Sequence, residues 1–312
     1  MSTAFSADGG TTWALQPGDV VQGNAQAYAS PTAAVTRPDG TPLQTWYGTL
    51  GTWVHAGLTP ATPSFDYQAP MGSYGNLPGI AVGSDGRAVL AWYSNANGHL
   101  GVYAREVAAD GSPVGGAVRM PGTSNMQIGQ TGRTPMAART GGGMYVAYPT
   151  GYPSLTRIRV WRVGAAVSTL VGRVAGGASA TVAGDRNGRM WVVWEDDGGP
   201  AVYARRSDRT GTDWGATVRA GRPKHGVSAY TVDASPVGDS ALDVFDSFAL
   251  NSGTPLATYT RRILPGLTLL AAGAARRGRD AKVTFTVRDA GDPVNTRAAR
   301  KLAVISPSGP AG

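Results

Sequence analysis

Short apolar segments separated by small polar turns recur along most of the chain. One unit has a segment at 79–84, an Asp85-Gly86 turn, a second segment at 87–93 and a third at 102–107. Apolar and polar residues that alternate with a period of two are typical of half-buried β-strands, and Asp-Gly dipeptides favour tight turns between strands. The pattern therefore predicts antiparallel strand meanders. Another copy of the unit has its segments at 180–184, 189–194 and 201–205.

Five such units follow one another, and their first segments begin near residues 31, 78, 135, 179 and 228. A fourth segment closes a unit at 116–120 and at 216–220. Four antiparallel strands that recur at this interval are the signature of a propeller blade, which buries its faces by stacking on neighbouring blades. A β-sandwich is the rival all-β architecture, and the repeated internal order argues against it. We therefore predict an all-β propeller of four-stranded blades over residues 1–265.

Two further turns share a more specific pattern. The first reads Ser-Ala-Asp-Gly-Gly-Thr-Thr-Trp from residue 6, and a degenerate copy begins at residue 207. The Asp can accept hydrogen bonds from later backbone N–H groups, and the Trp can pack between sheets as an apolar plug. The pattern resembles the Asp-box of the sialidase superfamily, also called the bacterial neuraminidase repeat. The resemblance implies a structural role in the turn for Ser6, Asp8, Gly10, Thr12, Trp13, Ser207, Asp208, Gly211 and Trp214.

The resemblance also bears on the number of blades, because six is the usual number in this superfamily. Residues 3–22 align with residues 204–220, so the N-terminal hairpin resembles the outer half of a blade. We expect either that this half completes the weak last unit and closes a six-bladed ring, or that an upstream segment has been lost.

The character of the sequence changes after residue 265. Alternating segments at 267–270 and 282–287 resemble the first strands of a bacterial immunoglobulin-like module, and the likeness ends near Val294. We therefore expect residues 266–312 to form a partial immunoglobulin-like segment. Its tail should be loosely packed or disordered, and the part from Gly291 onward should be dispensable.

Composition narrows the function classes. The net charge of +8 is concentrated in residues 261–312, which hold ten Lys or Arg against three Asp, so the main domain is nearly neutral and does not suggest nucleic-acid binding. The chain has no cysteine and no apolar run long enough to span a membrane, and its N-terminus does not read as a signal peptide. No phosphate-binding loop, dinucleotide fingerprint or metal-ligand spacing occurs, so we expect no cofactor and no metal.

Candidate binding residues follow from strand direction. Antiparallel strands alternate in direction, so the loops after the second strand of each unit and the connections between units should lie at the same end of the propeller, opposite the Asp8 and Asp208 turns. Loop side chains at that end are the predicted ligand contacts: Arg133, Arg157, Arg222, Tyr93, Asn95, His99 and Asp196. Sialidases use a Tyr nucleophile polarised by a Glu, together with an arginine triad and an aspartate acid/base. By this resemblance Glu195, Tyr148 and Tyr152 are the candidate catalytic residues, and the other glutamate, Glu106, is expected to be solvated.

Two functions remain open at this stage. The first is a recognition module, secreted or at the cell surface and monomeric, that binds a glycan or a glycoprotein without a demonstrable catalytic set. The second is a glycoside hydrolase of exo-sialidase type. The Arg-Ile-Pro motif that typically precedes the first blade of sialidases does not occur in this chain. A Tyr–Glu contact that faces converging arginines would identify the hydrolase, whereas a Glu195 that is solvated or paired with a loop Arg would indicate the recognition module.

Overall fold

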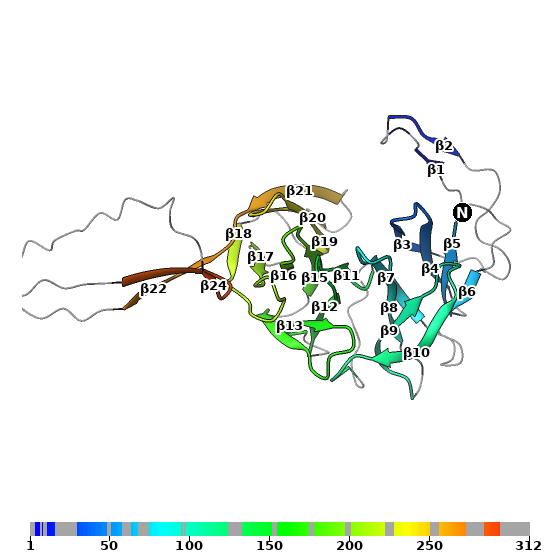
Figure 1. Ribbon diagram of the computed structural model, residues 1–312, viewed down its shortest axis with the longest axis horizontal. Helices are drawn as coiled ribbons and strands as arrows, with labels where there is room; N and C mark the ends of the chain where they lie inside the picture. The colour runs from blue at the N-terminus through cyan, green and yellow to red at the C-terminus, as the bar shows by residue number, and fades with distance from the viewer. Residues whose placement is uncertain are drawn as a thin grey trace, which may run out of the picture.

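The computed structural model describes residues 4–6, 8, 11–15, 30–48, 51–57, 64–67, 75–94, 96, 98–123, 133–151, 155–174, 178–196, 201–221, 228–249, 256–272 and 284–293. Within these residues every regular element is a β-strand (Figure 1). Five antiparallel sheets follow one another along the chain, and we number them as blades 1 to 5.

Four of the five blades have four strands, and the fifth has three. Blade 1 comprises β3 (Ser30–Thr36), β4 (Pro42–Gly48), β5 (Gly51–Ala56) and β6 (Ser64–Asp66). Blade 2 comprises β7 (Gly75–Val82), β8 (Ala88–Ser94), β9 (Gly101–Val107) and β10 (Pro113–Arg119). Blade 3 comprises β11 (Met136–Ala138), β12 (Met144–Thr150), β13 (Arg157–Arg162) and β14 (Thr169–Arg173). Blade 4 comprises β15 (Ala178–Gly184), β16 (Met190–Asp196), β17 (Ala201–Arg206) and β18 (Val218–Gly221). Blade 5 comprises β19 (Ser228–Val237), β20 (Ala241–Ala249) and β21 (Leu256–Ile263).

Each blade is a meander in which sequential strands pair, and its first strand lies innermost. Strand β7 contacts β3 of the preceding blade and β11 of the following one, and β15 likewise contacts β11 and β19. The chain therefore has a β-propeller arrangement of small antiparallel sheets, as the repeats predict.

The apolar alternation of the second strands explains why the blades stack. Along β12, Val146 and Tyr148 pack against blade 2, whereas Tyr145 and Ala147 pack against blade 4. Because both faces of a blade are covered, both sets of alternating positions are apolar and buried. Aromatic pairs recur at the same register: Trp92 stacks on Tyr103 and Trp194 on Tyr203, with ring centroids 5.9 Å apart in each pair.

Glycines allow the innermost strands to approach closely. A Cβ atom on Gly79 of β7 would lie 1.9 Å from the carbonyl oxygen of Thr134, just before β11. A Cβ atom on Gly184 of β15 would lie 2.3 Å from the carbonyl oxygen of Ala138. These two positions hold neighbouring blades at backbone contact distance, which no side chain would permit.

The described residues form five blades and not the six expected. The N-terminal hairpin, β1 (Ala4–Phe5) and β2 (Ala14–Leu15), forms a two-stranded sheet of its own and lies apart from β21 (Figure 1). Within the described residues β21 pairs only with β20, so the hairpin does not complete blade 5. Trp13 is 66% exposed and is therefore not the apolar plug that the sequence suggested. Trp214, in the second copy of the turn, does pack on the core between blades 3 and 4.

A small sheet follows the blades, built from β22 (Leu267–Ala272), β23 (Thr284–Asp289) and β24 (Asp292–Pro293). Its turn docks on blade 4, because Arg189 and Arg206 form buried ion pairs with Asp289, and Arg189 also pairs with Asp292. Asp292 therefore contacts blade 4, whereas the expectation that the chain is dispensable from Gly291 stays a prediction. The remainder of the predicted loose tail, from Val294, lies outside the described residues. No helix in the described part of the chain is long and apolar enough to cross a membrane.

Candidate functional site

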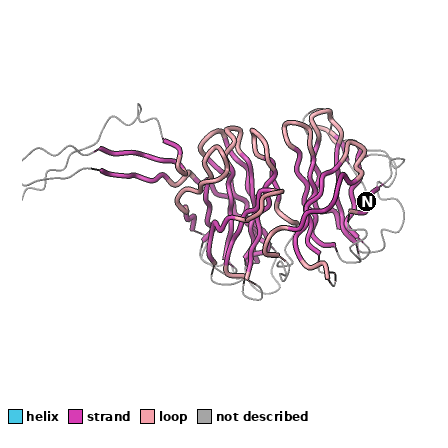
Figure 2. Tube along the Cα trace, turned by 60° about the horizontal axis from the view of Figure 1, so that its bottom comes forward, coloured by secondary structure: helices cyan, strands magenta, loops and turns pink. Residues whose placement is uncertain are grey.

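The two ends of the propeller differ in the turns they carry. In blade 4 the backbone N–H of Met190, at the start of β16, donates to Ser207 Oγ (2.8 Å), next to the Asp208 turn. Glu195, near the other end of β16, pairs in register with Val202 at the start of β17. Glu195 and Asp208 thus lie at opposite ends of the blade, as strand direction predicts. We call these the loop end and the turn end; turns of the described residues gather at one end of the blades in Figure 2.

The two Asp-containing turns are closed by the Asp carboxylates. Asp8 accepts hydrogen bonds from the Thr12 hydroxyl (2.6 Å), the Thr12 N–H (2.9 Å) and the Ser6 hydroxyl (2.8 Å), which lower the pKa of Asp8 to about 2. Asp208 accepts from the N–H groups of Thr212 (2.9 Å) and Asp213 (3.2 Å). Burial raises the pKa of Asp208, but these hydrogen bonds and that of Thr210 outweigh it, so the net shift is downward. Both carboxylates accept hydrogen bonds from residues of their own turns, which stabilises the turns.

Tyr93 and Tyr148 reach the loop end but are buried. Both belong to the core between blades 2 and 3, where Tyr93 is 5% and Tyr148 1% exposed. Burial raises the pKa of Tyr148, which is the opposite of what activates a phenol as a nucleophile.

Glu195 faces a different interface from Tyr148. Trp191 and Val193, which lie on the same face of β16 as Glu195, pack against blade 5. Glu195 is therefore directed toward blade 5, and it is fully buried. On the facing strand β20, Asp246 lies on the same face as Val244 and is also fully buried. The structure therefore does not bring Glu195 and Tyr148 together. Glu195 is buried and not solvated, and solvation was one of the two arrangements expected of a recognition module. Glu106, expected to be solvated, forms an ion pair with Arg87 at 2.7 Å.

Arg133 reaches the innermost strands of the propeller. Its guanidinium forms an ion pair with Asp233 of β19 at 2.7 Å, and the hydroxyl of Thr181 on β15 lies 3.4 Å from the same carboxylate. This cluster joins blades 3, 4 and 5 near the axis. Sequence reasoning missed Asp233, because it lies within a strand and a hundred residues from its partner.

Arg157 lies in a groove on the outside of the propeller. The groove has a volume of about 450 Å³ and is formed by the loop end of blade 3 together with the turn after β10 of blade 2. Arg159 is fixed within it by donating to the carbonyl (3.0 Å) and the hydroxyl (3.1 Å) of Ser168. Arg157 is exposed and forms no ion pair with another described residue. The groove is lined by Pro121, Gly122, Thr150, Gly151, Arg157, Arg159, Val167 and Ser168.

The remaining predicted residues that the structure describes do not line this groove. His99 is exposed in the loop before β9, and His55 is fully buried. Asn95, Tyr152, Arg222 and Gly10, as well as the side chain of Asp196, lie outside the described residues. Among the side chains that the structure describes, no group of three His, Cys, Asp or Glu is placed to hold a metal ion.

Comparison with known proteins yields only structural neighbours. No protein-family model matches the chain, and no curated protein matches it. A fungal lectin from Aleuria aurantia, described as a six-bladed β-propeller with a novel fucose recognition mode, shares 13% identity at a TM-score of 0.48, over 91% of this chain and 86% of the lectin. An endo-arabinase from Bacteroides thetaiotaomicron shares 11% identity at a TM-score of 0.46, over 75% of this chain and 93% of the enzyme. A Dyadobacter fermentans protein of unknown function shares 11% identity at a TM-score of 0.47, over 85% and 95% of the two chains. The fold is therefore assigned from the sheet topology itself.

Proposed function

We propose that this propeller is a recognition module that binds an acidic glycan, with Arg157 as the contact to the sugar carboxylate. The observation that carries the proposal is the exposed guanidinium of Arg157 in a groove of about 450 Å³. Pockets of a few hundred Å³ suit a small ligand. No carboxylate of the described residues forms an ion pair with Arg157, so its guanidinium is suited to bidentate pairing with a ligand carboxylate.

The remainder of the groove complements a sugar. Val167 is 74% exposed and offers an apolar surface for the face of a ring. Thr150, Gly151 and Ser168 line the same groove. A carbonyl or hydroxyl oxygen has two lone pairs, so such groups can accept a hydrogen bond from a ligand hydroxyl in addition to one from the protein. The two Asp-closed turns support a relationship to sialidase-like Asp-box propellers. The hydrolase alternative requires a contact between Tyr148 and Glu195, and the two residues face different blades.

Titration calorimetry with N-acetylneuraminic acid, glucuronic acid and neutral N-acetylglucosamine tests the proposal. We expect the two acids to bind and the neutral sugar not to bind. Arg157→Gln should weaken binding by about tenfold or more, the typical value of a charge-assisted hydrogen bond. Arg219→Gln, at an exposed arginine on β18 outside the groove, is the matched control. Equal binding of acids and neutral sugar, or unchanged binding by Arg157→Gln, would reject it. A fluorogenic sialoside tests the hydrolase alternative in parallel, and we expect no release of the fluorophore.

A further inference from the structure

The turn between the first two strands carries a carboxylate in three of the blades. In blade 1 the N–H of Thr41 donates to Asp39 (2.9 Å), and in blade 2 the N–H of Arg87 donates to Asp85 (3.1 Å). In blade 4 the N–H of Arg189 donates to Asp185 (2.9 Å). In each of these blades, the backbone N–H of the last turn residue therefore donates to an Asp carboxylate of the same turn.

Blade 3 keeps the frame of this turn but lacks the carboxylate. The N–H of Arg139 donates to the carbonyl of Gly143 (2.9 Å), and the N–H of Gly142 to that of Arg139 (2.9 Å), as Gly83 and Gly86 do in blade 2. Gly141 occupies the position of Asp85, so the turn itself offers no carboxylate to the N–H of Gly143. The turn has φ values of 90°, 100° and 97° at Gly141, Gly142 and Gly143, which side chains resist.

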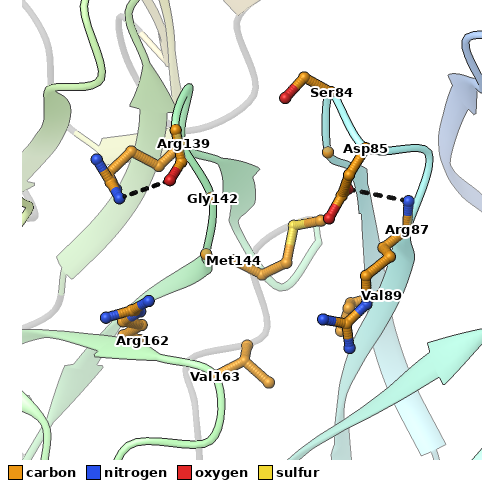
Figure 3. Close-up of a pocket in the computed structure, with 12 residues that line it drawn as sticks. Ser84, Asp85, Arg87, Val89, Arg139, Gly142, Met144, Arg162 and Val163 are labelled. Carbon is orange, nitrogen blue, oxygen red and sulfur yellow. Dashed lines mark hydrogen bonds between the residues drawn. The ribbon is translucent and has the colours of Figure 1, made fainter.

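This bare turn forms one wall of a cleft at the turn end of blades 2 and 3. The cleft has a volume of about 440 Å³, and Figure 3 shows Arg139, Gly142 and Arg162 on one side, with Asp85 and Arg87 on the other. Met144 lies between the two walls. The absence of side chains on the glycines keeps the turn accessible from the cleft.

Among the described residues, neither arginine on the glycine wall forms an ion pair with a carboxylate. Arg162 is exposed, and its Nε would lie 3.0 Å from a Cβ atom on Gly143, so its guanidinium is next to the turn. Arg139 donates to the backbone carbonyl of Arg209 (2.6 Å) rather than to a carboxylate. On the facing wall Arg87 is neutralised by Glu106.

We propose that this cleft binds the anionic group of a small hydroxylated ligand, a carboxylate or a sulfate ester. The oxyanion takes the place that Asp85 holds in the neighbouring turn, against the N–H of Gly143 and the guanidinium of Arg162. Asp85, on the facing wall, then accepts a hydrogen bond from a ligand hydroxyl and disfavours anions without one. This site is separate from the groove at Arg157, which lies at the other end of the strands.

Amide chemical shifts of the nitrogen-15-labelled full chain test this site at constant ionic strength. The probes are sodium glucuronate, sodium sulfate and neutral glucose. We expect glucuronate to shift the amides of Gly141, Gly142 and Gly143 saturably, sulfate to do so more weakly, and glucose to have no effect. If sulfate shifts these amides as strongly as glucuronate does, the site recognises only the anion, and the proposed hydrogen bond from a ligand hydroxyl to Asp85 is rejected.

Two variants separate the contributions of the turn and the arginine. Gly141→Asp supplies the missing carboxylate within the chain and should abolish the glucuronate shifts. Arg162→Gln should raise the dissociation constant by about tenfold or more, since it removes a charge-assisted hydrogen bond, while Arg219→Gln leaves it unchanged. If Gly141→Asp does not fold, Arg162→Gln alone tests the site, because Arg162 is exposed and its substitution should not prevent folding. Absence of any saturable shift, or equal binding by Arg162→Gln, rejects the site.

Discussion

The guanidinium of Arg206 lies over the ring of Trp191, with Cζ 5.1 Å from the ring centroid, and both side chains are buried. The same guanidinium pairs with Asp289 of β23 and donates to the carbonyl of Asp239 (2.7 Å). Beside it, Arg189 pairs with Asp292 at 2.8 Å. Blade 4 and the C-terminal sheet are therefore joined by a buried network of charges at the turn end.

Asp289→Asn should destabilise the protein and release the C-terminal sheet. Removal of the Asp289 charge leaves the buried guanidinium of Arg206 with the more distant Asp185, at 4.0 Å, as its carboxylate partner. Breaking a buried ion pair at one partner typically costs about 3–5 kcal/mol. Urea unfolding measures the loss, and limited proteolysis should cut first near β23. Arg262→Ala, which removes an exposed ion pair with Asp243 (2.7 Å), is the control and should change little. Equal effects of the two variants would contradict a locking role for the network.

Gly79→Ala should disturb the stacking of blades 2 and 3. Its Cβ atom would meet the Thr134 carbonyl at 1.9 Å, so the two inner strands must separate, with a cost of about 1–3 kcal/mol or more. Gly116→Ala is the matched control, because nothing lies within 4 Å of a Cβ atom there. Thermal unfolding of the two variants measures the difference, and a Gly79→Ala protein as stable as the control would contradict the close approach.

The Asp8 turn should lose its stability only at strongly acid pH. The folded pKa of about 2 lies below the ordinary value of 3.8, so the contribution of Asp8 is fully present above pH 3.8 and is lost as the pH falls through about 2. Carboxyl carbon-13 shifts of Asp8 measure the pKa directly. Asp8→Asn should remove this pH dependence from the Thr12 amide signal, and an unshifted titration near 3.8 would refute the hydrogen-bonded turn.

Tyr148 should remain protonated at pH values where exposed tyrosines ionise. Burial raises its pKa above the ordinary value of 10, so its phenolate forms only at higher pH. Ultraviolet difference titration of the wild type and Tyr148→Phe should give the same number of tyrosines ionising near pH 10. One fewer ionising tyrosine in the variant would show that Tyr148 is accessible and restore it as a candidate nucleophile.

The sequence by itself determined the strands, the order in which they pair and the end of the propeller at which each loop lies. The predicted first strands near residues 31, 78, 135, 179 and 228 correspond to strands that begin at Ser30, Gly75, Met136, Ala178 and Ser228. The Asp8 turn and the opposite placement of Glu195 and Asp208 followed equally well. These features depend on residues that are close in the chain, whose alternation and turn chemistry fix the local backbone.

Only the tertiary structure decided which side chains meet. It separated Tyr148 from Glu195, because each faces a different neighbouring blade, and it paired Arg133 with Asp233 across the inner strands. It also left the N-terminal hairpin outside blade 5 and joined Arg206 to Asp289. Contacts of this kind depend on how blades turn against one another, which is set by the summed packing of many distant residues. Alternation with a period of two predicts on which face of a strand a side chain lies. Which residue it contacts on that face depends on how whole sheets stack.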